Sequence, residues 1–171
     1  MRGFLAGPRR PMGRRDSHVT YLLRFWRFLQ ATFLKFDRVS NRVSPGEPIS
    51  RFVLSREHIK TGRVSFAAFM PSAKSMDVSV YRTGGCGERR IWLLGDLFVA
   101  AKRRDNRSIL ARADLAAQLF FKEGLEVIPE PSPHPRHANV TQWPSDKPQQ
   151  KIKAMTLANA AALRLRSQSV R

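Results

Sequence analysis

The sequence predicts an α+β fold: a small, mainly antiparallel sheet with helices on one face, preceded by a basic disordered arm and an aromatic amphipathic helix. Short runs rich in β-branched and aromatic residues alternate along the chain with apolar residues at helical spacing. In the clearest strand candidate, Val78 and Val80 alternate with polar neighbours, which is typical of a sheet covered on one side. A Pro- and Gly-containing breaker at residues 44–48 follows an Arg-rich segment. We therefore expect two parts, residues 1–48 and a domain at 49–171.

The first part combines an arm with a helix. Gly, Pro and Arg are so dense in residues 1–15 that we expect disorder there. Residues 17–38 contain no Pro or Gly and predict a helix with a narrow basic stripe on a broad aromatic and aliphatic surface. The stripe consists of Arg24, Arg27, Lys35 and Arg38. Such a helix can pack on the domain that follows, dock on a protein partner, or lie on an anionic membrane surface, which suits Trp and Phe.

The sequence leaves the origin of this first part open. An Arg-rich, acid-poor amphipathic start resembles a mitochondrial transit peptide. The abrupt change of composition at Pro48 also fits a start codon further downstream, in which case residues 1–48 do not belong to the mature protein. No uncharged apolar run of about eighteen residues occurs, so we expect no transmembrane segment.

The second part carries alternating strand and helix patterns. The predicted strands combine β-branched or aromatic residues with a nearby Gly or Pro, and the predicted helices show apolar stripes or capping residues. We predict strands at residues 49–54, 63–69, 77–82 and 125–128, helices at 88–102, 114–123 and 145–166, and a Pro-rich loop at 129–144.

The charge of the chain indicates its class of partner. The chain holds 31 Lys and Arg against 13 Asp and Glu, a net charge of +18. Such a field attracts polyanions, and the planar guanidinium of Arg can bind two phosphate oxygens at once. The single Cys86 excludes an internal disulfide framework and a Cys-cluster zinc site, and it fits the reducing cytoplasm. Glu88 stands where a Walker loop requires Lys after its last Gly, and we expect no cofactor.

These charges predict a nucleic-acid-binding protein. No helix-turn-helix, zinc finger or basic zipper is visible to read a major groove, so we expect RNA or single-stranded DNA. Basic runs at both ends of the helix predicted at 88–102 are placed to bind neighbouring phosphates, and aromatic rings are suited to stack on unpaired bases. The predicted binding residues are Arg51, Tyr81, Arg89, Arg90, Lys102, Arg103, Arg104 and Arg107, with Phe52 and Trp143 as further stacking candidates.

The Pro-rich loop predicts a second kind of site. His134 and His137 stand three residues apart with Arg136 between them, in a segment stiffened by prolines. Histidine transfers protons near neutral pH, so the pair can act as acid and base on a phosphodiester or nucleotide. In this alternative Arg136 holds the phosphate, and the protein is an enzyme.

A metal site is another use of the same two histidines. His58 can join them, with Asp96 or Glu57 completing the ligands. The His-x-x-His spacing is unspecific, and Pro135 excludes helical geometry between the two ligands. We therefore predict no metal.

One short motif resembles a known pair of families. Residues 80–84, Val-Tyr-Arg-Thr-Gly, resemble the start of the ADP-ribosyltransferase and RNA 2′-phosphotransferase families. The resemblance implies that Arg82, borne on a strand, meets the ribose of NAD. It covers five residues, and the later Ser-Thr-Ser strand and Glu-x-Glu of these families are absent from the sequence. We assign the chain to no family on this basis.

Overall fold

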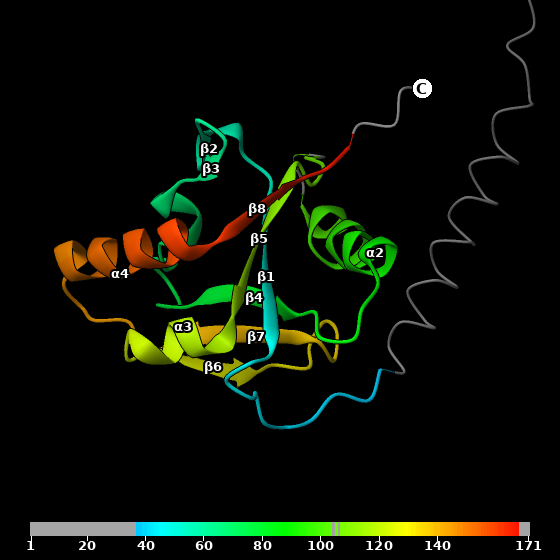
Figure 1. The fold of residues 1–171 in the computed structure, drawn as a ribbon, viewed down its shortest axis with the longest axis horizontal. Coiled ribbons are helices and arrows are strands. Elements are labelled where there is room, and N and C mark those ends of the chain that lie inside the picture. Colours follow the sequence, from blue (N-terminus) through cyan, green and yellow to red (C-terminus); the bar gives the residue numbers. More distant parts are fainter. Residues whose placement is uncertain (1–36, 104, 106, 168–171) are drawn as a thin grey trace, which may run out of the picture. The chain divides into compact units, whose positions relative to one another are not determined.

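The computed structural model of the protein describes residues 37–103, 105 and 107–167, and its centre is a six-stranded sheet (Figure 1). The strand order is β6-β7-β4-β1-β5-β8, and every neighbouring pair is antiparallel. The predicted α+β fold class is confirmed. The strands of this sheet are β1 (Pro48–Val53), β4 (Val78–Arg82), β5 (Ala111–Ala116), β6 (Glu126–Pro129), β7 (His137–Thr141) and β8 (Ala162–Leu165).

Helices and a small hairpin complete the described fold. The hairpin is formed by β2 (Ile59–Lys60) and β3 (Arg63–Val64). The α-helices are α2 (Glu88–Phe98), α3 (Ala117–Lys122) and α4 (Lys147–Ala160), and short 3-10 helices lie at Arg56–His58, Phe66–Phe69 and Ala100–Lys102. Asp146 caps α4 by accepting a hydrogen bond from the Gln149 backbone N–H at 3.1 Å.

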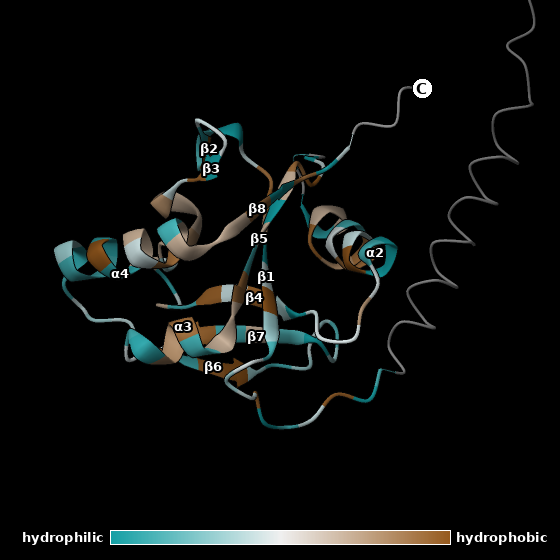
Figure 2. Cartoon of the chain, viewed as in Figure 1, coloured by the Kyte–Doolittle hydropathy of each residue, from teal (hydrophilic) through white to brown (hydrophobic). Residues whose placement is uncertain are grey.

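One face of the sheet packs on the main hydrophobic core. Alternate residues of the strands point to this face, among them Ile49 and Val53 of β1 and Val78 and Val80 of β4. α4, α3 and the 3-10 helix at Phe66–Phe69 cover it. Apolar residues are concentrated along β4 and β6 in Figure 2. Burial of this apolar surface is the main source of stability for the fold.

The opposite face of the sheet carries α2, so helices lie on both faces and not on one as predicted. Phe52 points away from the main core, and the Cα of Gly95 on α2 approaches it so closely that a Cβ there would lie 2.9 Å from the Phe52 ring. The same added Cβ would lie 3.1 Å from Ile109. The glycine in the middle of α2 thus allows the helix to pack against the sheet.

Several segments differ from their predicted structure because strand pairing overrides local preference. Residues 111–116 form β5 along β1, although the sequence predicts a helix from residue 114. β7 lies within the segment predicted as a loop and pairs with both β4 and β6. The last predicted helix ends at Ala160, after which β8 pairs with β5. Of the strand predicted at 63–69, only residues 63–64 are a strand.

The helix predicted at 17–38 lies outside the described residues, apart from Asp37 and Arg38, which are not helical. The segment 37–47 leads into β1 without regular structure. No helix in the described part of the chain is long and apolar enough to cross a bilayer.

Replacement of Gly95 tests the contact between α2 and the sheet. We expect Gly95→Ala to lower the free energy of unfolding by about 1–3 kcal/mol, because the new methyl group overlaps the buried Phe52 ring. In an open helix the same change would stabilise by up to about 1 kcal/mol. Urea unfolding measures the sign, with Gly46→Ala, which has open space around it, as the control. A stabilised Gly95→Ala variant would contradict the packing.

Candidate functional site

Arg82 attaches the segment before β1 to the end of β4. Its side chain is 2% exposed and forms a bidentate ion pair with Glu47 at 2.7 and 2.9 Å. The same guanidinium donates to the carbonyl oxygens of Ser40 and Arg42. Charge-assisted bonds of this geometry are among the strongest polar contacts in proteins. The arginine that the ADP-ribosyltransferase resemblance places at a ribose therefore has all three nitrogens engaged within the fold.

Asp37 joins two basic side chains from different elements. It accepts hydrogen bonds from Arg136, which precedes β7, and pairs with Arg90 of α2 at 2.7 Å. Arg136 also donates to the carbonyl oxygens of Arg82 and Gly84, at 3.1 and 2.8 Å. Burial alone would raise the pKa of Asp37, but the hydrogen bond and charge of Arg136 and the charge of Arg90 lower it below 3.8. Arg136, predicted to hold a phosphate, is used to fix the loop.

His134 lies in the interior. It is fully buried, its ring centroid is 4.7 Å from that of Phe98, and its Nδ1 accepts a hydrogen bond from the Arg136 backbone N–H at 3.0 Å. An Nδ1 that accepts carries no proton, so the ring is the neutral Nε2–H tautomer. His134 thus supports the turn that leads to His137. The ring of His134 lies against Phe98, whereas that of His137 lies against Tyr81.

His137 forms a hydrogen-bonded chain with Ser79. Its Nδ1 lies 2.9 Å from the carbonyl oxygen of Glu130, which can only accept, so Nδ1 carries the proton. In the neutral ring Nε2 is then an acceptor, and the Ser79 hydroxyl lies 2.6 Å from it and donates. The ring centroid of Tyr81 lies 5.4 Å from that of His137 and fixes the ring from the side. Hydrogen bonds thus connect the Ser79 hydroxyl, the His137 imidazole and the Glu130 carbonyl in this order.

The surroundings of His137 keep its ring neutral. Burial lowers the pKa of His137 below 6.5, and the positive charge of Lys102 acts in the same direction. The hydrogen bond to the Glu130 carbonyl and the charges of Glu130 and Asp77 oppose this effect but do not cancel it. At neutral pH the ring can therefore take up a proton at Nε2.

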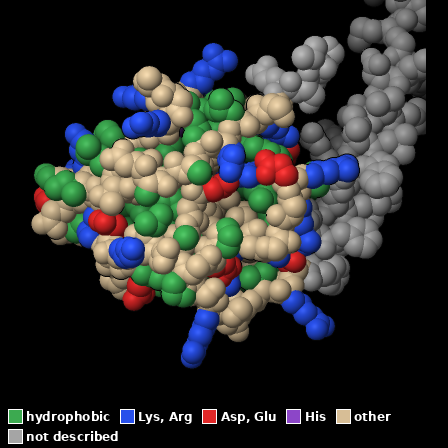
Figure 3. Space-filling view, in the orientation of Figure 1, with side chains coloured by type: hydrophobic (Ala, Val, Ile, Leu, Met, Phe, Trp, Pro, Cys, Tyr) green, Lys and Arg blue, Asp and Glu red, His purple; other side chains and the backbone are tan. Residues whose placement is uncertain are grey.

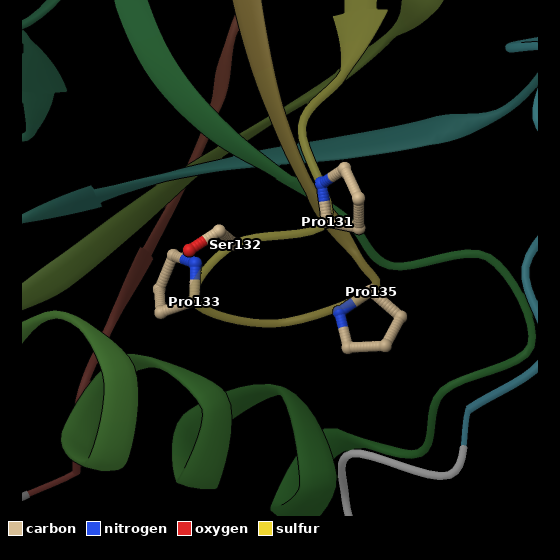
Figure 4. A pocket seen from close by; sticks show the side chains of 4 residues that line it. All are labelled: Pro131, Ser132, Pro133 and Pro135. Atoms are coloured by element: carbon tan, nitrogen blue, oxygen red, sulfur yellow. The ribbon is translucent and has the colours of Figure 1, made fainter.

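The proline loop beside this chain is open to solvent. Pro131, Ser132, Pro133 and Pro135 surround a hollow of about 500 Å³ (Figure 4). The peptide bond between Ser132 and Pro133 is cis. The loop joins Glu130 to His137, so the residues around the hollow lie in sequence between two of the three hydrogen-bonded groups.

A polar layer lies between the sheet and the first turn of α2. Arg112 of β5 is 4% exposed and binds Asp114 and Glu88, with Nη1 and Nη2 at 2.8 and 2.7 Å from the Glu88 oxygens. The Ser50 hydroxyl donates to Asp114 at 2.6 Å. Trp92 donates to Glu88 and lies with its ring centroid 4.9 Å from the Arg112 guanidinium. These contacts fix α2 on the sheet.

Two of the predicted binding residues are used inside the fold. β1 and β4 pair only near their ends, and Arg51 fills the gap beyond by donating to the carbonyl oxygens of Ala68 and Ser79 at 3.0 and 2.7 Å. Tyr81 is 2% exposed and packs between Phe52 and His137. The further stacking candidates Phe52 and Trp143 are buried as well. No described ring among these three is available to a base.

The helix predicted at 88–102 ends at Phe98, so the other predicted binding residues lie in the first turn of α2 and in the segment after it. Arg89 and Lys102 are exposed, and neither forms an ion pair within the described part of the chain. Arg103 and Arg107 are about half exposed and share Asp105, whose pKa the Arg103 hydrogen bond lowers to about 2. Arg90 pairs with Asp37. Arg104 lies outside the described residues. Figure 3 shows Lys and Arg side chains around much of the rim of one face.

The candidate metal ligands do not converge. His58 follows Arg56 in a 3-10 helix; burial and the charge of Arg51 lower its pKa. Among the residues described here, no three His, Cys, Asp or Glu side chains gather as a ligand set.

Comparison with protein-family models, curated proteins and solved structures finds no match.

Sequence reasoning missed Ser79, Glu130 and Asp37. The alternation of β4 does place Ser79 on the same face as Tyr81, opposite Val78 and Val80. The missing information was that β7 exists, because only this strand brings His137 beside β4. Asp37 contacts Arg136 across a sequence distance of 99 residues, which no local pattern indicates.

Asp37 gives an acid-dependent test of the loop anchor. We expect Asp37→Asn to lower the free energy of unfolding at neutral pH by about 1–3 kcal/mol, since Arg136 loses its anionic partner. The folded pKa of Asp37 is lowered, so its contribution is complete above pH 3.8 and is lost as the pH falls through the lower folded value. Urea unfolding should show a smaller difference in acid. Glu126→Gln on β6 is the control, and a difference independent of pH would contradict the ion pair.

Lys102 gives a test of the electrostatics at His137. We expect Lys102→Met to raise the pKa of His137, leaving it below 6.5 because burial still acts. NMR titration of the imidazole resonances measures the shift, and Lys122→Met on α3 controls for the loss of one charge. An unchanged His137 titration would show that Lys102 does not act on the ring.

Proposed function

We propose that the protein binds RNA or single-stranded DNA along α2, through phosphate contacts from basic side chains in its first turn and in the segment that follows the helix. The observation that supports this is the pair of exposed cations, Arg89 and Lys102, which have no ion-pair partner within the described residues. Arginines needed for the fold, such as Arg82 and Arg112, are buried and paired instead. The fold thus separates structural arginines from those that remain open to an anion.

The ion-paired arginines near Lys102 add to this surface. Arg103 and Arg107 both bind the exposed Asp105. Exposed pairs of this kind are weak because solvent and salt screen them, so a phosphate can replace the carboxylate at little cost. Until then Asp105 holds the two guanidinium groups close together. Binding then exchanges one anion for another.

The separation of the two ends suits several nucleotides. Arg89 and Phe98, the last residue of α2, are nine positions apart, which corresponds to about 14 Å at 1.5 Å per helical residue, and Lys102 ends the 3-10 helix that follows. A stacked strand rises about 3.4 Å per nucleotide, so the length of α2 matches phosphates about four nucleotides apart. A flexible single strand can adjust its backbone to this spacing.

The contacts favour affinity over sequence preference. Tyr81, Phe52 and Trp143 are buried, so the described residues offer no ring from this set to a base. Phosphate contacts position a strand but carry no sequence information. We propose weakly selective binding in the cytoplasm, the compartment that the single Cys86 fits.

Salt dependence tests this proposal. We expect the full chain to bind a labelled single-stranded RNA, with an affinity that falls steeply as salt rises. The double variant Arg89→Gln, Lys102→Gln should reduce the slope of log affinity against log salt by about 1.4, because each lost phosphate contact removes about 0.7 for a single strand.

The matched control changes the same number of charges elsewhere. Lys122→Gln, Lys147→Gln removes two exposed cations from α3 and α4 and should leave the slope nearly unchanged. Equal losses in the two double variants would indicate general attraction by the net charge. Binding that does not respond to salt would contradict phosphate contacts altogether.

A further inference from the structure

The contact between Ser79 and His137 has the arrangement of an activated nucleophile. The hydroxyl donates to Nε2 at 2.6 Å, and Nδ1–H is oriented by the Glu130 carbonyl at 2.9 Å. A nucleophile within hydrogen-bond reach of a base, which is itself oriented by a third group, is the common feature of serine-dependent acyl transfer. Here a backbone carbonyl takes the place of the usual carboxylate.

The site is positioned by rigid elements. Ser79 lies on β4 and His137 begins β7, and these strands pair directly, with Ser79 opposite Asn139 and Tyr81 opposite His137. Tyr81 packs against the imidazole, and Arg51 binds the carbonyl of Ser79. Side chains held by paired strands keep their geometry better than side chains on loops.

Solvent reaches the segment that orients the base. Ser79 is half-buried and His137 is 8% exposed, and the loop that joins the Glu130 carbonyl to His137 borders the open hollow of Figure 4. The charges that act on His137 have both signs, Lys102 against Glu130 and Asp77, so they favour no particular charge on the substrate.

We propose that Ser79 is the nucleophile, and His137 the general base, of a hydrolase for carboxylic esters. This activity goes beyond the binding of nucleic acid and uses a different residue, Ser79. Its chemistry requires only the ester and water.

The reaction proceeds through an acyl-enzyme. Ser79 Oγ bonds to the carbonyl carbon while its proton moves to His137 Nε2. The ester C–O bond then breaks, and the departing alkoxide takes the proton from the imidazole and leaves as the alcohol. Water, deprotonated by the same nitrogen, attacks the acyl group, releases the carboxylic acid and restores Ser79 with its proton.

Covalent labelling tests the nucleophile directly in the unaltered full chain. A fluorophosphonate should form one adduct, with loss of fluoride, and peptide mass spectrometry should locate the adduct on Ser79. The rate of labelling should fall as the pH decreases through the pKa of His137, below 6.5, where the base becomes protonated. No adduct, or an adduct only on other residues, would overturn the proposal.

Variants separate the base from the fold. Ser79→Ala should abolish labelling, and His137→Gln, which can still accept from Ser79 but cannot take its proton, should slow it by about 100-fold or more. Ser108→Ala, an exposed serine of the described loop before β5, should label at the wild-type rate. Urea unfolding of each variant verifies that it is folded. Undiminished labelling of a folded His137→Gln variant would overturn the role of the base.

Turnover is tested with 4-nitrophenyl acetate. The full chain should release 4-nitrophenol, and Ser79→Ala should abolish this release. Undiminished turnover by a folded Ser79→Ala variant would overturn the proposal. Ser79→Ala should retain RNA binding, so failure of the esterase and failure of the nucleic-acid proposal are distinguishable.

Discussion

The ion pairs of Asp37 are the contacts on which the arrangement of the candidate site depends. A single half-buried carboxylate holds Arg136 and Arg90, and so connects the turn before β7 with the first turn of α2. Because Arg136 also binds the carbonyl oxygens of Arg82 and Gly84, the end of β4 belongs to the same network. The turn that places His134 inside and His137 beside Ser79 is therefore fixed by polar contacts, in addition to the packing of His134 on Phe98.

The positive charge of this chain is divided between buried arginines and exposed ones. Arg51, Arg82, Arg112 and Arg136 satisfy carbonyl and carboxylate oxygens within the fold, and their donors are engaged there. A buried arginine with several partners specifies one arrangement of the surrounding backbone, since each unmade bond would cost free energy. Net charge counts these side chains together with the exposed ones, so it overstates the field available to a partner.

The parts of the fold predicted correctly are those whose information is local. β1, β4, β6 and α2 have their own apolar patterns and nearby Gly or Pro residues, so composition within a short window sufficed. β5, β7 and β8 are strands because they pair with neighbouring strands. Their local sequence patterns predict helix or loop instead. The histidine loop was recognised by residue type, whereas its chemistry depends on Ser79, which reaches it only through the pairing of β4 with β7.

The strand order also determines when the sheet can form during synthesis. Among the described residues, β1 is the first strand, and it lies near the middle of the sheet. Its neighbour β5 follows about sixty residues later, and β8, at one edge, is complete only at residue 165. Pairings between such distant segments make folding slow, because the intervening chain must lose its freedom before the contacts form. On the ribosome, β1 can pair with β4 once residues 78–82 have emerged, but its other edge has no partner until β5 follows, so it stays open to chaperones for longer.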